Sequence, residues 1–227
     1  TKSFSYVYCG LRDQNDNLDE NTLSEKLKKA IIQLVKRDRY HLYLKYLEEL
    51  ITNIFFLTDL EDNEDAIRSV DFNLLSQEYN LFSSGQTALI YILAEIIANI
   101  EKESLVLFDE PETHLHPNAI IKLVKVLNLL LKKFDSYAIL ATHSPQIVQQ
   151  IFSKNVIVFD RVGNVPFIRK LDIESFGENL TTINQEIFET VEIDEFYKEE
   201  FTKLLDTHTY EEISKFFRNK LSFNAAL

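Results

Sequence analysis

Four apolar residues followed by two carboxylates form the stretch Leu105-Val106-Leu107-Phe108-Asp109-Glu110. A short apolar run of this kind predicts a buried strand, and both carboxylates would emerge at its carboxyl end. Open parallel sheets bind their ligands at that edge. Two acids there suit phosphoryl transfer, because one can hold Mg²⁺ through its water shell and the next can orient or deprotonate an attacking water. The alternative is that the two acids form a solvated turn at the end of the strand and have no catalytic role. The neighbouring sequence bears on this choice.

The sequence around this strand alternates short apolar runs with amphipathic helical patterns. We expect helices over 85–99 and 117–134, a short helix after Pro145, and strands at Leu105–Phe108, Tyr137–Ala141 and Val156–Asp160. Pro117 suits the first position of its helix, because its fixed φ is helical and its missing amide donor costs nothing there. This alternation is typical of an α/β fold in which helices cover a parallel sheet.

Three segments divide the chain. Residues 1–80 begin with a predicted strand at Phe4–Tyr8 and continue into helical patterns, the first of which has Thr22 as its expected N-cap. Residues 81–176 hold the α/β pattern. Residues 177–227 read as helical and acidic, with no further strand signal. We therefore expect an α/β lobe with helical segments on both sides.

Composition limits the classes of protein that fit this sequence. The formal net charge is −12, which disfavours non-specific coating of nucleic acid and restricts any DNA contact to a local patch. No apolar run is long enough for a membrane span, and the single cysteine cannot form an internal disulfide, so we expect a cytoplasmic protein. The chain contains no methionine, which favours a fragment of a longer protein.

Two further clusters flank the carboxylate pair. Upstream, Phe82-Ser83-Ser84-Gly85-Gln86 opens a predicted helix, so hydroxyls, a glycine and free amide donors gather at a positive helix end that can clamp a phosphate. Downstream, His143 follows the next predicted strand within Ala141-Thr142-His143-Ser144-Pro145. At the tip of that strand, a histidine can reach the same terminal phosphate as the carboxylates.

The order and spacing of these clusters resemble ABC-type ATPases, which are P-loop NTPases. Residues 82–86 are similar to the signature motif, Leu105 to Glu110 to the Walker B strand, and His143 to the switch histidine. Residues 109–117, Asp-Glu-Pro-Glu-Thr-His-Leu-His-Pro, resemble the SMC-like and overcoming-lysogenization-defect-like branch found in DNA repair and antiphage defence. Members of that branch are often paired with an HNH-type nuclease, as in Septu and some retron systems.

The resemblance implies a role for each matching residue. Asp109 would support Mg²⁺, Glu110 would polarise the hydrolytic water, and His143 would contact the γ-phosphate of ATP. Ser83, Ser84, Gly85 and Gln86 would touch the nucleotide held by an opposite subunit, because two heads of this family enclose two ATP molecules. The expected protein is therefore an ATPase that dimerises on ATP and acts in antiviral defence or DNA repair, with a nuclease partner and possible contact with DNA.

One departure from the family pattern is clear. The P-loop Gly-x-x-x-x-Gly-Lys-Ser/Thr is absent, since the chain contains no Gly-Lys pair. One hypothesis is that residues 1–80 lie between two lobes of a larger ATPase whose P-loop is upstream. The other is a degenerate head, or a non-hydrolytic interaction module, that docks an effector protein. We favour the first, because Glu110 and His143 serve a nucleotide bound in cis and both are intact.

Two other groups of residues could have a function, but another interpretation is favoured for each. His114 and His116 could ligate a transition metal beside the acidic pair, although the family resemblance already explains them as loop residues. Tyr40, Tyr43 and Tyr46 could stack on nucleic-acid bases, but their helical spacing favours packing in the core.

Overall fold

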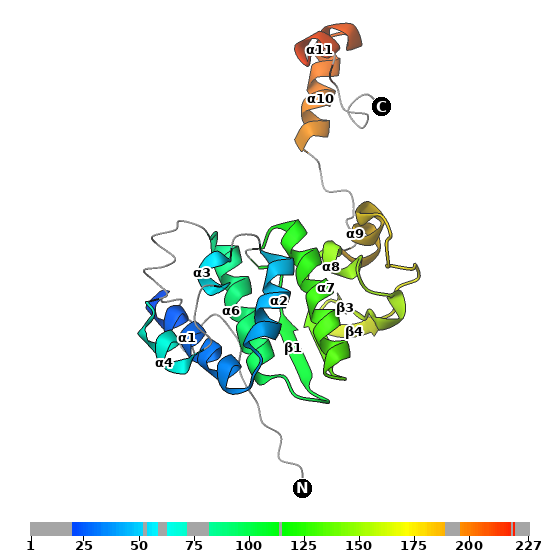
Figure 1. Cartoon of the computed structure of the whole chain (residues 1–227). Helices are drawn as coiled ribbons and strands as arrows, with labels where there is room; N and C mark the ends of the chain where they lie inside the picture. The colour runs from blue at the N-terminus through cyan, green and yellow to red at the C-terminus, as the bar shows by residue number, and fades with distance from the viewer. Residues whose placement is uncertain are drawn as a thin grey trace.

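The structure is a computed structural model of the chain (Figure 1). It describes residues 20–51, 54–58, 63–71, 82–113, 115–188, 196–218 and 220. The strand predicted at Phe4–Tyr8 lies outside the described residues, as do Leu81 and His114.

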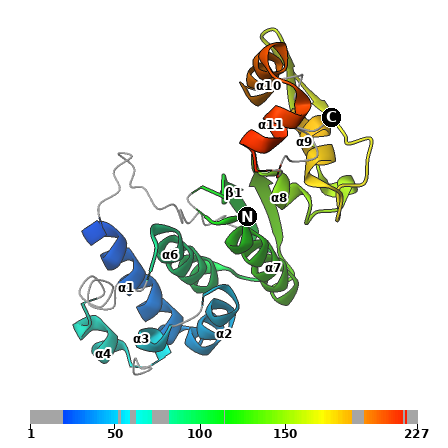
Figure 2. The ribbon, with the colours of Figure 1, turned by 90° about the horizontal axis from the view of Figure 1, so that it is seen from above.

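Helix α6 (Ser84–Asn99) is the centre of the core. It is buried on nearly every side, and Leu89, Leu93 and Ile97 are each at most 1% exposed. In Figure 2 it lies between α1 (Glu20–Lys36) and α7 (Pro117–Lys133). Its start and end agree with the predicted helix to within one residue, because Ser83 forms a capping box with Gln86 at the amino end.

Among the residues that the structure describes, four helices come before α6. They are α1, α2 (Tyr40–Leu50), α3 (Phe55–Thr58) and α4 (Glu64–Ser69). Helix α1 already begins at Glu20, so Thr22 lies inside the helix and is not its N-cap. Asn63 caps α4 by accepting hydrogen bonds from the amides of Asp65 and Ala66.

The tyrosines of α2 belong to the core. Tyr40, Tyr43 and Tyr46 are between 0% and 8% exposed, and the hydroxyl of Tyr43 donates to the carbonyl of Ile90 in α6. Burial raises the pKa of Tyr43 well above its usual value. Rings that pack inside the protein cannot stack on nucleic-acid bases, so the packing interpretation of this stripe is the correct one.

Strands β1 (Leu105–Asp109) and β2 (Tyr137–Ala141) form a parallel pair, as predicted. The register places Leu105 opposite Tyr137 and Asp109 opposite Ala141, so both strands end at the same edge. Phe108 packs from the sheet against the core. The α/β class and the parallel pairing are therefore confirmed.

The opposite face of this sheet differs from the expected arrangement. Its side chains are apolar but exposed: Leu105 57%, Leu107 64%, Tyr137 67% and Ile139 60%. We call these four side chains the open sheet face. The sequence predicted a sheet covered by helices, whereas the described residues cover only one side of it.

Strands β3 (Val158–Val162) and β4 (Val165–Arg169) form a separate antiparallel hairpin. The predicted strand at Val156–Asp160 thus begins two residues too early, and β4 was not predicted. Gly163 in the connecting turn has φ of +60°, a conformation that glycine adopts without strain. Arg169 of β4 pairs with Asp160 of β3 at 2.6 Å and with Glu186 of α9 (Leu180–Phe188) at 3.1 Å, which anchors the hairpin on that helix.

A short segment joins β2 to this hairpin. It contains α8 (Pro145–Val148), the predicted short helix, and a 3₁₀ turn at Ser153–Asn155. The buried hydroxyl of Ser175 donates to the carbonyl of Ile151 at 2.6 Å, and the amide of Gly177 donates to the carbonyl of Gln149 at 2.9 Å. These bonds hold the segment before α9 against α8.

The carboxy-terminal part of the described chain is helical, as predicted. Helices α10 (Phe196–Thr207) and α11 (Tyr210–Phe216) meet at Thr209, which forms a capping box with Glu212 (Figure 1). Within the described ranges, no helix has the length and apolar content that a membrane span requires.

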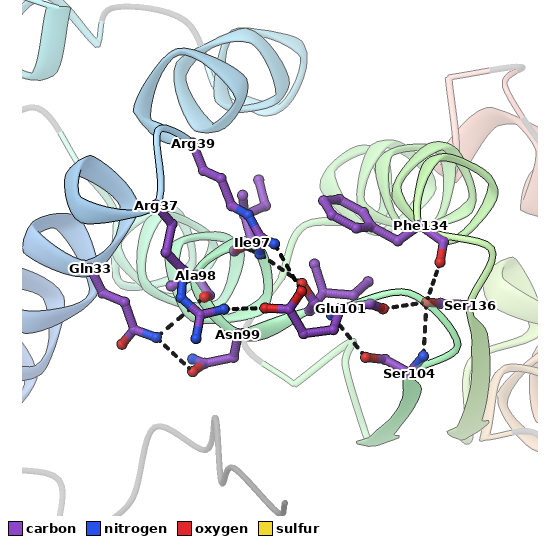
Figure 3. Close-up of polar contacts among 11 residues, drawn as sticks. Gln33, Arg37, Arg39, Ile97, Ala98, Asn99, Glu101, Ser104, Phe134 and Ser136 are labelled. Carbon is purple, nitrogen blue, oxygen red and sulfur yellow. Dashed lines mark hydrogen bonds and ion pairs between the residues drawn. The ribbon is translucent and has the colours of Figure 1, made fainter.

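An arginine binds the carboxyl end of α6. Arg39, in the turn between α1 and α2, donates to the carbonyls of Ile97 at 2.9 Å and Ile100 at 2.6 Å (Figure 3). Its guanidinium also pairs with Glu101 and lies 5.1 Å from the ring centre of Phe134. A cation at this position satisfies carbonyls that a helix end leaves open and interacts favourably with the helix dipole.

Candidate functional site

The predicted carboxylates and histidine meet where β1 and β2 end. The amide of Glu110 donates to the carbonyl of Ala141 at 2.8 Å, which extends the ladder one residue beyond the sheet. His143 follows β2 by two residues, and its Nε2 lies 3.4 Å from Oε1 of Glu110. Both side chains are more than half exposed, so a ligand at this edge can reach them.

The backbone of Glu110 has an unusual conformation. Its φ is +44°, in the left-handed region that non-glycine residues seldom occupy. The amide of Thr113 donates to the Glu110 carbonyl at 3.1 Å, and the Thr113 hydroxyl donates to Oε2 of the same residue at 3.4 Å. Residues held in such conformations cluster at active sites and ligand clamps, because a tight turn can aim one side chain where an extended strand cannot.

Asp109 lies beside this pair at the same edge. Asp109 pairs with Ala141 in the β1–β2 ladder, and Asp109 is exposed to solvent. In the part of the chain that the structure describes, the Asp109 carboxylate has no hydrogen-bond or ion-pair partner. A free carboxylate at the edge of a parallel sheet is the type of oxygen ligand that Mg²⁺ or its bound water takes, so Asp109 fits the cation.

Glu112 also belongs to this edge, and sequence reasoning missed it. Its Oε1 accepts two hydrogen bonds of 2.7 Å, one from the Thr142 hydroxyl and one from the His143 amide. The residue thereby joins the loop after β1 to the loop after β2. Its position two residues beyond Glu110 is visible in the sequence, but nothing in the spacing indicates a partner 30 residues away.

The signature-like residues lie at the amino end of α6. The Ser83 hydroxyl accepts from the Gln86 amide at 3.3 Å, while the Gln86 side chain accepts from the Ser83 amide at 2.8 Å. The amides of Ser84 and Gly85 are then the two first-turn donors without a partner inside the helix. A helix end of this kind can bind a phosphate.

A cavity of about 380 Å³ opens beside this helix end. Its polar lining comes from Ser83, Gln86, His116, Asn118 and Lys122, and Gly85 forms part of its wall. Neither Glu110 nor His143 contributes to it. The structure therefore brings the predicted residues together as two groups, one at the edge of the sheet and one at the start of α6.

The structure describes only one histidine of the His-x-His pair, because His114 lies outside the described residues. His116 is the N-cap of α7, and its Nδ1 accepts from the Asn118 amide at 3.3 Å. Among the described residues, no three His, Cys, Asp or Glu side chains are grouped as a metal-binding cluster.

Comparison with known families matches residues 13–149 to the family described as "AAA domain, putative AbiEii toxin, Type IV TA system". The match includes α6, both strands of the parallel sheet and the loops that carry Glu110 and His143, and it spans more than half of the chain. The chain belongs to this AAA-domain family. Membership implies a P-loop NTPase fold, with which the mixed α/β structure and its parallel strand pair agree.

Three relatives show the breadth of this AAA-domain similarity. Protein ea59 of Escherichia phage lambda is 29% identical to this chain. The aligned region covers 97% of this chain and 46% of protein ea59. The Septu protein PtuA of Bacillus thuringiensis is 28% identical over 73% of the chain and 48% of its own length. Endonuclease GajA of Bacillus cereus is 27% identical over 65% of the chain and 25% of its own length. The chain thus spans about half of the first two relatives.

Proposed function

We propose that this AAA-domain chain carries the catalytic carboxylate and switch histidine of an ABC-type, SMC-like ATPase that dimerises on ATP. The observation that carries the proposal is the pairing of Glu110 and His143, 3.4 Å apart, at the carboxyl ends of adjacent parallel strands. Ligands of open α/β sheets bind at this edge. The resemblance to ABC-type ATPases assigns the same two residues to hydrolysis.

Each residue at the edge has a distinct proposed task. The Glu110 carboxylate accepts a hydrogen bond from the attacking water and orients it toward the γ-phosphate of ATP. The His143 imidazole donates to the terminal phosphate, where negative charge accumulates. Asp109 would hold Mg²⁺ through a water molecule, and the cation would supply positive charge beside the phosphates.

The second group of residues supports a dimeric arrangement. Ser83, Ser84, Gly85 and Gln86 lie at the start of α6, beside a cavity that does not include Glu110 or His143. We assign these residues to the nucleotide of a second head, which they contact through amide donors and the side chain of Gln86. A homodimer then contains two sites, each built from both subunits.

The open sheet face supports a further lobe that carries the P-loop. Strand β1 is continuously apolar, a pattern typical of strands that are buried on both faces. In the structure, Leu107 and Ile139 are instead at least 60% exposed, and β1 and β2 are the only strands that the described residues contribute to this sheet. We propose that a lobe with the missing Gly-rich loop packs on this face. Residues 81–176 are then the carboxy-terminal lobe, 1–80 the segment between lobes and 177–227 a helical extension.

The relatives point to antiviral defence as the setting. One is named a Septu protein and another an endonuclease. We propose that ATP turnover in this protein controls a nuclease partner, of the HNH type in the Septu-like case, in defence or DNA repair. The alternative is a non-hydrolytic module that docks an effector. The exposed apolar residues of α10 and α11, among them Leu205 (59%) and Phe216 (66%), favour a docking role for those helices in either case.

Glu110→Gln tests the proposed reaction in a preparation that contains the complete ATP site. We expect phosphate release to fall by about 10²-fold or more, since a positioned general base contributes on this order. ATP binding and ATP-dependent dimerisation should persist. Glu199→Gln, an exposed substitution in α10, is the matched control and should leave the rate unchanged. Equal rates for wild type and Glu110→Gln would favour the docking module instead.

A further inference from the structure

Glu112 links the two loops that carry the candidate catalytic pair. Its Oε1 accepts from the Thr142 hydroxyl and from the His143 amide, both at 2.7 Å. The Thr142 hydroxyl oxygen in turn accepts from the Ser144 amide at 2.9 Å. Both bonds have the length of well-formed hydrogen bonds and end on the same acceptor oxygen. The loop after β2 is therefore tied at three consecutive residues.

The other end of this link is also fixed. The backbone carbonyl of Glu112 accepts from the Leu115 amide at 2.9 Å, and that of Glu110 accepts from the Thr113 amide. These bonds form the tight turn in which Glu110 has its positive φ. One residue thus connects the turn that aims the Glu110 carboxylate to the backbone that carries the His143 imidazole.

The environment of Glu112 differs from that of Glu110. Its Oε2 atom is buried and has no hydrogen-bond partner among the described residues. Glu110 is 52% exposed. A buried carboxylate oxygen without a hydrogen-bond partner lowers the free energy of unfolding. Its presence at this position therefore indicates a role other than stabilising the fold. Because Oε2 is buried and Oε1 already accepts two hydrogen bonds, we assign Glu112 no direct part in hydrolysis.

We propose that Glu112 is a positioning residue, which holds the His143 loop so that the imidazole and the Glu110 carboxylate stay at reacting distance from one phosphate. The inference rests on the proposed ATPase function. In this arrangement Glu112 acts through an accepted hydrogen bond and not through its charge. The Glu112→Gln variant keeps an acceptor oxygen at the same place, whereas Glu112→Ala removes it.

Steady-state kinetics of the protein with a complete ATP site separates these possibilities. Glu112→Ala should lower kcat by about 30-fold or more with KM for ATP within about twofold of wild type, because a misplaced catalytic group loses rate before it loses substrate binding. Glu112→Gln should recover kcat to within about threefold of wild type. Thr142→Val should give an intermediate loss, because the bond from the His143 amide remains. An unchanged kcat in Glu112→Ala, or an equal loss in Glu112→Gln and Glu112→Ala, would overturn the proposal.

Hydrogen exchange provides a second measurement that needs no turnover. The His143 amide of this chain should exchange slowly in wild type and Glu112→Gln, and at least about tenfold faster in Glu112→Ala, because its acceptor is lost. Fast exchange in the wild type, or equal exchange in all three, would refute the link itself. If the exchange pattern is as expected but wild type does not hydrolyse ATP, the proposed function fails and the positioning role fails with it. If wild type turns over but exchange does not respond, only the role of Glu112 fails.

Discussion

Glu95 is an ionisable residue on α6 whose environment disfavours its charged form. Burial raises the pKa of the Glu95 carboxyl, while Lys26 and the hydrogen bond from Asn99 oppose that rise. When the folded state has the higher pKa, it retains a proton that the unfolded chain releases as the pH increases. Glu95 therefore contributes stability below the ordinary carboxyl pKa and loses that contribution as the pH rises through its folded pKa.

Glu95→Gln removes this titration. We expect the variant to be more stable than wild type at pH 7, with the difference shrinking toward pH 4, where both side chains are neutral. Urea unfolding of both proteins across this range measures the effect. Glu199→Gln, on the exposed surface of α10, serves as the control. A difference that stays constant from pH 4 to pH 7 would contradict the assigned cause.

The residues of the candidate site were predictable to different degrees. Asp109, Glu110 and His143 could be placed together because each follows an apolar run, and the ends of parallel strands meet at one edge. Glu112 could not be assigned a role, because its partners lie in another loop and a hydrogen bond between loops leaves no periodic pattern in the sequence.

Among the helices and strands, predictions succeeded where a local signal marks the boundary. Ser83 caps α6 and Pro117 opens α7, and both helices begin within one residue of their predicted starts. Strand β4 was missed, because it contains Pro166, which lacks an amide donor and usually argues against a strand. In an antiparallel hairpin of two strands, an outward-facing donor is dispensable, so the proline is tolerated there.

The contact of Arg39 with the end of α6 leads to a prediction about stability. Arg39 is 17% exposed and donates to two carbonyls that the helix end leaves open. Arg39→Ala should lower the free energy of unfolding by about 2 kcal/mol, because buried acceptors lose a charged donor. Urea denaturation checks this value.

Arg37 provides a matched control for that experiment. It pairs with the same Glu101 but is 39% exposed. Arg37→Ala should change stability by no more than about 0.5 kcal/mol, because exposed ion pairs contribute little. If both variants lost the same stability, the carbonyl contacts of Arg39 would not be the cause.

For the molecule as a whole, the open sheet face is the feature that the sequence could not predict. A continuous apolar run such as Leu105 to Phe108 indicates burial on both sides. Which part of the structure provides that burial depends on contacts distant in sequence. The described residues cover only the side that carries Phe108.

Polar substitutions on the open sheet face should affect the free energy of unfolding differently in this chain alone and in a protein that includes the P-loop lobe. In this chain alone, Leu107→Ser and Ile139→Ser should barely change the free energy of unfolding, because both side chains are already exposed. In a protein that includes the proposed P-loop lobe, each should cost about 2 kcal/mol, the value for a buried aliphatic side chain. Equally small effects in both contexts would argue against a lobe on this face.

A double-substitution cycle on ATP turnover tests the pairing of Glu110 and His143 most directly. Phosphate release is measured for wild type, Glu110→Gln, His143→Ala and the combined variant, each with its complete ATP site. If the two side chains act on one phosphate, each single change should reduce kcat by about 10²-fold, and the combined variant should lose less than about tenfold more, because residues that act as a unit are not additive. Turnover that survives either single change, or losses that multiply in the combined variant, would contradict a joint role at the edge of the β1–β2 sheet.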